Sequence, residues 1–320
     1  MSADGIQTDH LTGAPAEYVT PATRPSLPEA QAWCRTLATT HYENFHVATW
    51  FLPARIRPYF ESIYAFSRVS DDLGDEVADS KLASSLLRSW KGMLDECYDS
   101  PERSRHPVYV ALQQTIAETG APRNLFSDLI DAFQTDQTVV RYETLEQLVD
   151  YSRCSANPVG RLVLWVSGYR DEERALLSDK VCTALQLTNF WQDVVEDWER
   201  GRRYLPAEEM RRFGVSDAQI ASRTFTLEFE AMMRELVGYA RTMLLAGGTL
   251  SATVDRELAV TLDLFRNGGL AALDGIAAQG FDVLKSRPSV SKMVKAKLLA
   301  GALLGKTAGL FARSRTVEQA

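Results

Sequence analysis

The sequence predicts an all-α protein that folds as a single domain, and three observations support this prediction. From about Pro28 onward, apolar residues recur at helical spacing in nearly every segment. Alternating β-branched runs bounded by Asn-Gly or Asp-Gly turns are almost absent, so strands are not expected. No linker is long enough to separate two domains, and no repeat period stands out. Packed helices around one core are the simplest arrangement.

The expected elements follow from apolar spacing and from helix breakers. Residues 1–27 are rich in Pro, Thr, Ala and Gly, and we expect a flexible leader there. The main domain is expected over residues 28–288, and a basic helix and tail over 289–320. Helices are predicted near residues 27–42, 53–76, 80–98, 107–119, 122–135, 144–154, 158–168, 171–200, 216–221, 226–247, 251–267, 269–284 and 289–312.

Composition excludes several classes of function. The chain is 45% apolar and 24% charged, which is typical of a soluble protein with a sizeable core. A net charge of −7 argues against nucleic acid as a partner. The N-terminus lacks the pattern of a secretory signal, and the four scattered cysteines form no zinc motif. We therefore expect a cytoplasmic protein.

A polar column on one predicted helix is the first chemical signal. Asp71 and Asp75 lie four residues apart, and Tyr64 and Arg68 precede Asp71 by seven and three residues. At these spacings all four residues share one helix face. A single Asp pair of this kind is also common on ordinary surfaces, where like charges cost roughly 0.2–0.5 kcal/mol.

A second column repeats the arrangement on another predicted helix. Gln186, Asn189, Asp193 and Asp197 fall at i, i+3, i+7 and i+11, and most of their neighbours are apolar. A polar stripe on an otherwise apolar helix indicates a buried helix with one wet, functional side. Two such columns are much less expected by chance than one.

The repulsion within each Asp pair makes sense if divalent cations lie between the carboxylates. Mg²⁺ prefers carboxylate oxygens, water and substrate phosphates, and two carboxylate pairs on facing helices can bridge several ions to one diphosphate. We predict that Asp71, Asp75, Asp193 and Asp197 bind several Mg²⁺ ions and face one another across the mouth of an apolar cavity.

Two short segments near the second column add to this hypothesis. Arg202 and Tyr204 follow the helix end at Gly201, and arginine forks suit diphosphate oxygens. Alternatively, basic residues there only complement the helix dipole. Pro158 should break a helix and free the Asn157 amide to face a cavity, although a plain helix boundary is the other interpretation.

These residues together resemble the squalene and phytoene synthase family over about residues 30–285. The matching segments come in the family's order and spacing: His41–Phe45, Tyr64–Asp75, Tyr151–Gly160 and Gln186–Tyr204. The resemblance implies an isoprenoid synthase fold whose helices surround a central cavity, with Asp71/Asp75 and Asp193/Asp197 as its aspartate-rich motifs. It also implies roles in diphosphate binding for Phe45, Arg68, Arg202 and Tyr204, and roles beside the reacting carbon chain for Tyr64, Tyr151, Asn157, Gln186 and Asn189.

Within the family, the segments Tyr42–Phe45, Cys154–Leu162 and Asn189–Asp193 look most like the bacterial hopanoid-pathway branch. That branch implies conversion of presqualene diphosphate to hydroxysqualene, with release of diphosphate, capture of the cation by water and no need for NADPH. Two departures are His46, where the branch commonly has Pro, and Gln192, where several members carry Arg. The second departure puts one diphosphate contact in doubt.

Two alternatives remain open. One is head-to-head condensation of two prenyl diphosphates such as farnesyl diphosphate, which the motifs do not separate from the first reaction. The other is a non-catalytic assembly protein of the same fold, which the four intact aspartates disfavour. If the product is an alcohol, one water must be held by two to four polar groups. The candidates are the side chains of Tyr64, Tyr151, Asn157, Gln186 and Asn189.

The C-terminal segment between Val283 and Val317 contains no Asp or Glu. Its basic residues are Lys285, Arg287, Lys292, Lys295, Lys297, Lys306, Arg313 and Arg315. A basic helix with an imperfect apolar face can lie on an anionic membrane surface. It can equally pack on the domain with its lysines in water. Peripheral contact with the inner membrane surface is therefore one of two expectations for this segment.

Overall fold

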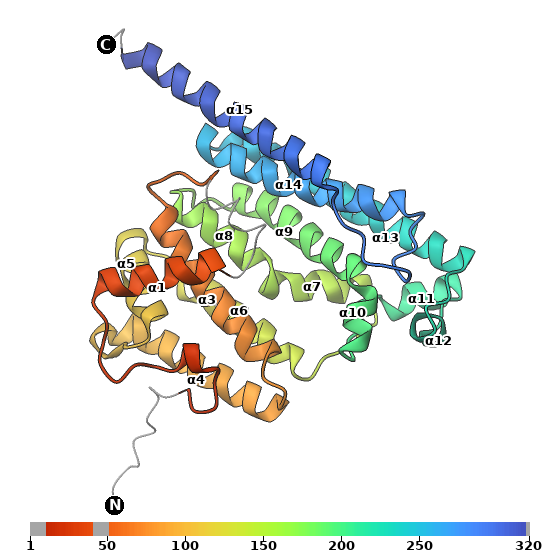
Figure 1. The fold of residues 1–320 in the computed structure, drawn as a ribbon, viewed down its shortest axis with the longest axis horizontal. Coiled ribbons are helices and arrows are strands. Elements are labelled where there is room, and N and C mark those ends of the chain that lie inside the picture. Colours follow the sequence, from red (N-terminus) through yellow and green to blue (C-terminus); the bar gives the residue numbers. More distant parts are fainter. Residues whose placement is uncertain (1–10, 41–50, 318–320) are drawn as a thin grey trace, which may run out of the picture. The chain divides into compact units, whose positions relative to one another are not determined.

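The computed structural model describes residues 11–40 and 51–317, with the side chains of the last helix described to residue 304. The all-α prediction is confirmed: over these residues every named element is helical, and the one β-bridge, between Arg141 and Arg203, is isolated. The helices gather into two compact units, drawn largely in red to yellow and in green to blue (Figure 1). Unit 1 holds the described residues up to 40, 54–138 and 161–168, and unit 2 holds 51–53, 139–160 and 169–317. The domain limits predicted at residues 28 and 288 stay predictions.

Unit 1 is built around α3, which packs against the other long helices of the unit. Its elements are η1 (Ala16–Tyr18), α1 (Leu27–Thr40), α3 (Arg57–Asp75), α4 (Ser80–Asp99), η2 (Pro101–Arg103), α5 (Pro107–Thr119) and α6 (Arg123–Asp136). The core beside α3 is aromatic: the Phe66 ring lies 5.1 Å from that of Phe126 and 5.9 Å from that of Trp90, centroid to centroid. This packing fixes which face of α3 stays accessible.

The predicted leader needs correction over residues 11–27. Leu11 and Tyr18 are buried, and the Tyr18 hydroxyl donates a hydrogen bond to the Asp72 carboxylate on α3. A segment with little apolar periodicity is thus held by two isolated anchors, which a periodicity argument does not detect. Residues 1–10 lie outside the described part of the chain.

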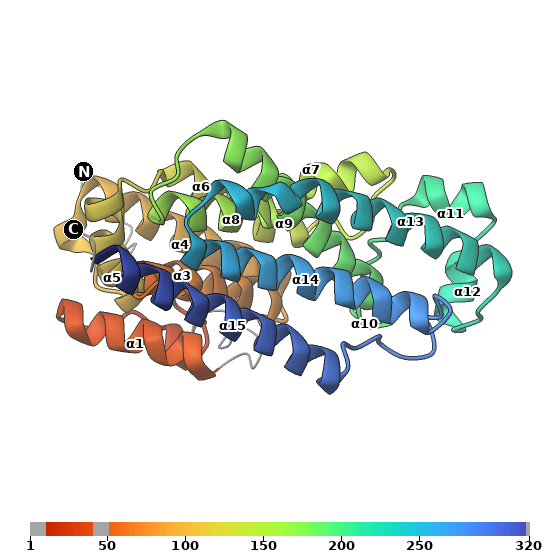
Figure 2. The ribbon, with the colours of Figure 1, turned by 90° about the horizontal axis from the view of Figure 1, so that it is seen from above.

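Unit 2 is organised around α9, which contacts α7, α13 and α14. Its elements are α7 (Leu145–Ser155), α9 (Glu172–Gln192), α10 (Val194–Glu199), α11 (Ala207–Phe213), α12 (Asp217–Ala221), α13 (Leu227–Ala246), η3 (Gly247–Thr253), α14 (Arg256–Ala278) and α15 (Lys292–Val317). The helix α8 (Asn157–Val166) begins in this unit and ends in unit 1. Figure 2 shows α13, α14 and α15 running side by side, and α14 contacts both of its neighbours.

Among the differences between the expected and observed helices of unit 2, two concern α14 and α11. The chain has one helix, α14, where we expected a break between residues 267 and 269. A Cβ atom on Gly269 would lie 2.5 Å from Cδ2 of Leu185 on α9, so this glycine allows close helix packing and not a turn. The short helix α11 was not predicted. It follows Pro206 and ends at Gly214, with acidic residues in its first turn and basic residues in its last.

Within the described residues, no helix combines the length and the apolar character that crossing a membrane requires.

Candidate active site

The first polar column lies on α3, as predicted. Because α3 is continuous from Arg57 to Asp75, Tyr64, Arg68, Asp71 and Asp75 line one face. The first three of these side chains are half-buried and Asp75 is exposed, whereas most of the residues between them are buried in unit 1. The common face is therefore confirmed, and the metal and substrate roles of its residues stay predictions.

Arg68 is held in place by two neighbouring carboxylates. Its Nε donates to Asp72 Oδ2 at 3.0 Å, and its Nη1 lies 3.3 Å from Asp71 Oδ2. Asp72 is only 3% exposed and also accepts the hydrogen bond from Tyr18. Burial, together with that bond, raises the pKa of the Tyr18 phenol, which therefore stays a donor at neutral pH. Arg68 thus lies between a buried counter-ion and a predicted metal ligand.

The second polar column keeps its register across a break that the sequence did not predict. The helix expected over 171–200 ends at Gln192 and restarts as α10 at Val194, because Asp193 has φ −102° and ψ 20°. Hydrogen bonds of the helical type nevertheless continue: the Asp193 amide donates to Asn189 O at 2.9 Å, and the Asp197 amide donates to Asp193 O at 2.8 Å. Asn189, Asp193 and Asp197 therefore stay on one stripe.

Arg287 forms an ion pair with Asp193, and no sequence signal indicated this contact across 94 residues. The guanidinium is bidentate, with Nε on Oδ1 and Nη2 3.1 Å from Oδ2. Beside it, Gln192 is buried and its Nε2 donates to Pro288 O at 2.9 Å. Gln192, whose role was in doubt, therefore holds the segment that carries Arg287.

Asp197 is a half-buried carboxylate one turn from a second carboxylate. Burial, followed by the charge of Asp193 one turn earlier, raises the pKa of Asp197 to about 7. A divalent cation would offset the repulsion between the two carboxylates, and hard oxygen donors of this kind suit Mg²⁺. The residues present therefore fit the predicted ion on the side of unit 2.

The complete metal set is not assembled within either unit. Asp71 and Asp75 belong to unit 1, whereas Asp193 and Asp197 belong to unit 2, and each unit is described by itself. Over the described part of the chain, no three His, Cys, Asp or Glu side chains are gathered as one metal site. The prediction that the four aspartates face one another across a cavity mouth stays a prediction.

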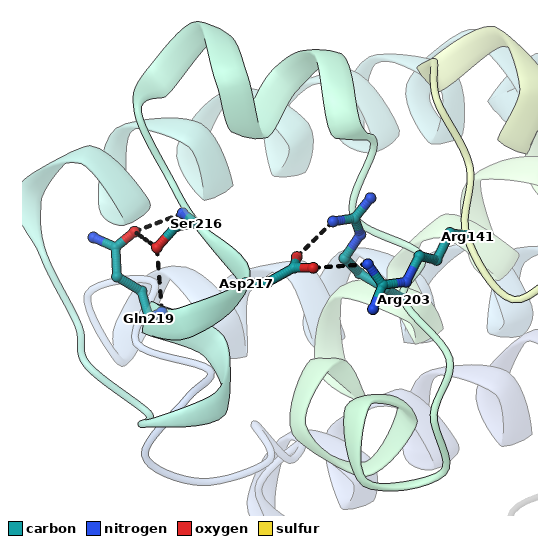
Figure 3. Close-up of polar contacts among 5 residues, drawn as sticks. All are labelled: Arg141, Arg203, Ser216, Asp217 and Gln219. Carbon is teal, nitrogen blue, oxygen red and sulfur yellow. Dashed lines mark hydrogen bonds and ion pairs between the residues drawn. The ribbon is translucent and has the colours of Figure 1, made fainter.

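The loop that follows α10 is pinned by backbone and side-chain contacts. The Arg202 amide donates to Asp197 O at 2.8 Å, and the Arg203 amide donates to Val140 O at 2.7 Å. The guanidinium of Arg203 binds Asp217, which also binds Arg141 (Figure 3). The sequence singled out Arg202 but missed Asp217, because nothing in local spacing links α12 to this loop.

An aromatic cluster lies beside the same loop. We define it as the rings of Tyr142, Tyr151, Phe190 and Tyr204. The Tyr204 ring stacks on Phe190 with 3.7 Å between centroids and an interplanar angle of 9°. Tyr151 lies 5.6 Å from Tyr142 and 6.1 Å from Phe190. The structure thus brings the predicted residues Tyr151 and Tyr204 together and adds Tyr142, which no sequence signal indicated.

The helix break near Asn157 is confirmed, but the freedom of its amide needs correction. α7 ends at Ser155 and α8 begins at Asn157, which is buried. Its Oδ1 accepts a hydrogen bond from Thr183 Oγ1 on α9 at 2.9 Å, so the carbonyl half of the amide ties two helices together. A Cβ atom on Gly160 would lie 2.3 Å from Ser178 Oγ, which shows how closely α8 approaches α9.

The other predicted residues have simpler outcomes. On α9, Gln186 is half-buried and Asn189 is exposed, one turn apart as expected. Phe45, together with His41 and His46, lies outside the described residues, so its predicted role in diphosphate binding stays a prediction.

Comparison with known proteins now adds to this geometry. Residues 18–294 match the sequence model of the squalene/phytoene synthase family. A hydroxysqualene synthase from Zymomonas mobilis is 32% identical over 68% of this chain and 73% of its own length. A chloroplastic phytoene synthase from Daucus carota is 28% identical over 90% of this chain and 73% of its own length. The crystal structure of squalene synthase HpnC from Alicyclobacillus acidocaldarius superposes with a TM-score of 0.76 at 40% identity, covering 80% of this chain and 95% of that one.

Proposed function

Because this chain belongs to the squalene/phytoene synthase family, we propose that it converts presqualene diphosphate to hydroxysqualene with release of diphosphate. The chain is an enzyme that processes prenyl diphosphates. The observation that carries the finer proposal is its identity of 32% to a hydroxysqualene synthase and of 40% to a solved HpnC squalene synthase. Both values exceed the 28% found for a plant phytoene synthase.

The aspartate columns would hold the metal ions for this reaction. Asp71 and Asp75 on α3, and Asp193 and Asp197 at the break after α9, supply the carboxylate oxygens that Mg²⁺ prefers. Bound Mg²⁺ would neutralise the charge that develops on the departing diphosphate. Arg68 and Arg202 would add guanidinium contacts to the same oxygens.

The aromatic cluster suits the carbon skeleton. In the proposed reaction the C–O bond to diphosphate breaks, the cyclopropylcarbinyl cation rearranges, and water adds and loses a proton to give an alcohol. The electron count closes without a reductant, so we expect no requirement for NADPH. The π face of Tyr151, the half-buried member of the cluster, can stabilise such a cation, and the stacked rings of Phe190 and Tyr204 support it from the core. Gln186, Asn189 and the hydroxyls of Tyr64 and Tyr151 remain candidates to hold the water.

The test is product analysis with the purified full chain. Presqualene diphosphate and farnesyl diphosphate are supplied separately, each with and without Mg²⁺ and NADPH, and products are identified by mass spectrometry. We expect hydroxysqualene from presqualene diphosphate with Mg²⁺ alone. Formation of squalene only when NADPH is present would refute the proposed branch. Absence of turnover, with no binding of Mg²⁺ and diphosphate, would favour an assembly protein.

Head-to-head condensation is the second candidate, and the match to phytoene synthase over 90% of the chain favours keeping it. In that case farnesyl diphosphate would be consumed and presqualene diphosphate, or a longer condensation product, would accumulate. The same experiment separates the two reactions, because it shows which of the two separately supplied substrates is consumed.

We also propose that α15 contacts an anionic membrane from the cytoplasmic side. Met293 and Leu304 are 68% and 70% exposed, and their spacing places them on one helix face with the exposed Lys297. Half-buried residues such as Leu298 and Ala302 lie on the opposite side of this helix, which packs on α14. Exposed apolar residues beside lysines suit a surface of anionic lipids.

Vesicle co-sedimentation tests this contact. The protein should bind vesicles that contain phosphatidylglycerol and bind neutral phosphatidylcholine vesicles weakly, with binding that falls as salt rises. Met293→Ser with Leu304→Ser should reduce binding severalfold. Equal recovery with both vesicle types, or no change in the double variant, would contradict the proposal.

A further inference from the structure

The Arg202–Tyr204 loop is braced by a second stretch of chain, residues 139–143, which we call the brace. One backbone hydrogen bond joins the loop to the brace directly: Arg203 N donates to Val140 O at 2.7 Å. Two more join the first turn of α11, just after the loop, to the brace: Ala207 N donates to Tyr142 O at 3.1 Å, and Glu208 N to Glu143 O at 2.9 Å. Arg141 and Arg203 also form a parallel β-bridge. The loop is therefore fixed at Arg203, and the helix that follows it is fixed at its first turn.

Asp217 holds the side chains of both partners in this bridge. Its Oδ1 accepts from Arg203 Nη1 at 2.5 Å, and its Oδ2 accepts from Arg141 Nη1 at 2.7 Å (Figure 3). The Arg203 side chain is only 12% exposed, whereas those of Arg141 and Asp217 are 53% and 37% exposed. One carboxylate thus joins the loop, the brace and α12.

The position of Asp217 is itself fixed by local structure. Asp217 is the first residue of α12, and Ser216 and Gln219 form a capping box around it (Figure 3). The Ser216 amide donates to Gln219 Oε1 at 2.6 Å, and the Gln219 amide is bonded to Ser216 Oγ at 3.4 Å. A capping box fixes where a short helix starts. Asp217 therefore meets the two arginines from a preorganised helix end.

Arg203 stands between two residues of the candidate active site. Arg202 precedes it and its amide is bonded to Asp197 O, while Tyr204 follows it and lies in the aromatic cluster. Consecutive Cα atoms are about 3.8 Å apart, so fixing the Arg203 backbone limits where both neighbours can lie. We propose that Asp217 is a positioning residue that aims Arg202 at the diphosphate and keeps Tyr204 stacked in the aromatic cluster. This inference rests on the proposed function.

A purely stabilising role for the same contacts predicts a different result. Because the Arg203 side chain is only 12% exposed, the loss of Asp217 leaves its guanidinium without this carboxylate, and a purely stabilising role predicts a lower melting temperature with unchanged substrate affinity. A misplacement of about 1 Å in a binding group can nevertheless cost as much as roughly 10²-fold in rate or affinity. Substrate affinity and stability therefore separate the two roles.

The test compares Asp217→Asn with Asp274→Asn, which removes another Arg–Asp ion pair of unit 2, with Arg241 Nη2 2.6 Å from Asp274 Oδ1. For Asp217→Asn we expect KM for presqualene diphosphate to rise about tenfold with kcat within about twofold, because Arg202 contacts diphosphate in ground and transition states alike. Affinity for inorganic diphosphate with Mg²⁺, measured by calorimetry, should fall by a similar factor. Asp274→Asn should match the wild type in both measurements.

A second variant keeps the inference testable if Asp217→Asn folds poorly. Arg203→Gln should reproduce the rise in KM, and the double variant should be no worse than either single variant, because both changes release the same loop. Asp217→Glu, which keeps the charge, should recover part of the affinity. Unchanged KM and diphosphate affinity in both single variants would overturn the positioning role. A wild-type protein that neither binds diphosphate nor turns over substrate would instead overturn the proposed function.

Discussion

On α3, Asp71 receives its positive neighbour from three residues away, because Arg68 lies on the same helix. At the break after α9, Asp193 receives its positive neighbour from Arg287, 94 residues further along the chain. Arg68 is also fixed by the buried Asp72, whereas the Arg287 side chain is 48% exposed. The first column is thus a rigid, locally encoded unit. The second depends on a distant contact with an arginine that is half-exposed.

The largest effect on kcat is expected when the first aspartate of either polar column is replaced. Asp71→Asn and Asp193→Asn should each lower kcat by about 10²–10³-fold, because each removes a predicted metal ligand and charge stabilisation at the leaving group. Diphosphate release measured under saturating substrate checks this, with circular dichroism to confirm folding. If only one variant lost activity, the proposal that the two aspartate columns serve one site would be contradicted.

A stability measurement sharpens the contrast between the two arginines. Arg68→Ala should lower the free energy of unfolding by about 3 kcal/mol, because it leaves the buried Asp72 carboxylate without its cation. Arg287→Ala should cost less, about 1 kcal/mol, since the Arg287 side chain is half-exposed and its pair with Asp193 is only partly buried. Urea unfolding of both variants gives the comparison. Equal losses would mean that the Arg287 contact is structural.

A smaller loss of stability is expected at the start of α8. Asn157→Ala removes the acceptor of the buried Thr183 hydroxyl and should destabilise the protein by about 1–3 kcal/mol. Thr183→Val is the matched control, because it removes the donor while filling a similar volume. If Asn157→Ala instead kept wild-type stability but altered the product, the Asn157 side chain would take part in the reaction.

The smallest effect on rate is expected from the two amides on α9. Gln186→Ala and Asn189→Ala should change the ratio of the alcohol to hydrocarbon products more than they change the rate of diphosphate release, because both variants would misplace the water. Both quantities are measured in one reaction. Unchanged product ratios would reject the proposed water site, and loss of diphosphate release in Asn189→Ala alone would assign that residue to metal or diphosphate binding.

Local signals predicted much of the fold. The helix α5 was predicted at its observed limits because Pro107 begins it and Gly120, with φ +67°, ends it. The same type of signal misled us at Gly269, where a glycine serves packing against α9 and not a turn. Composition also misled us at Tyr18, a single anchor in a segment without periodicity.

The candidate site also contains features that local sequence signals predict and features that they do not. The column on α3 was predictable because helical spacing alone places its residues on one face. The contacts of Arg287 with Asp193 and of Asp217 with Arg203 were not, because they join elements that are brought together only by tertiary packing. The placement of candidate side chains on one helix face could be predicted from sequence, whereas the distant residues that contact them could not.

The short stretch between Arg287 and the start of α15 at Lys292 limits the distance between the two. Five residue steps span at most about 18 Å, so the Cα atom of Lys292 cannot lie farther than this from the Cα atom of Arg287, whose guanidinium binds Asp193. Upstream, the buried Val283 and Leu284 anchor the same stretch in the core of unit 2. Because α15 also packs on α14, which contacts α9, a surface that holds α15 is linked to the aspartate column both through Arg287 and through α14.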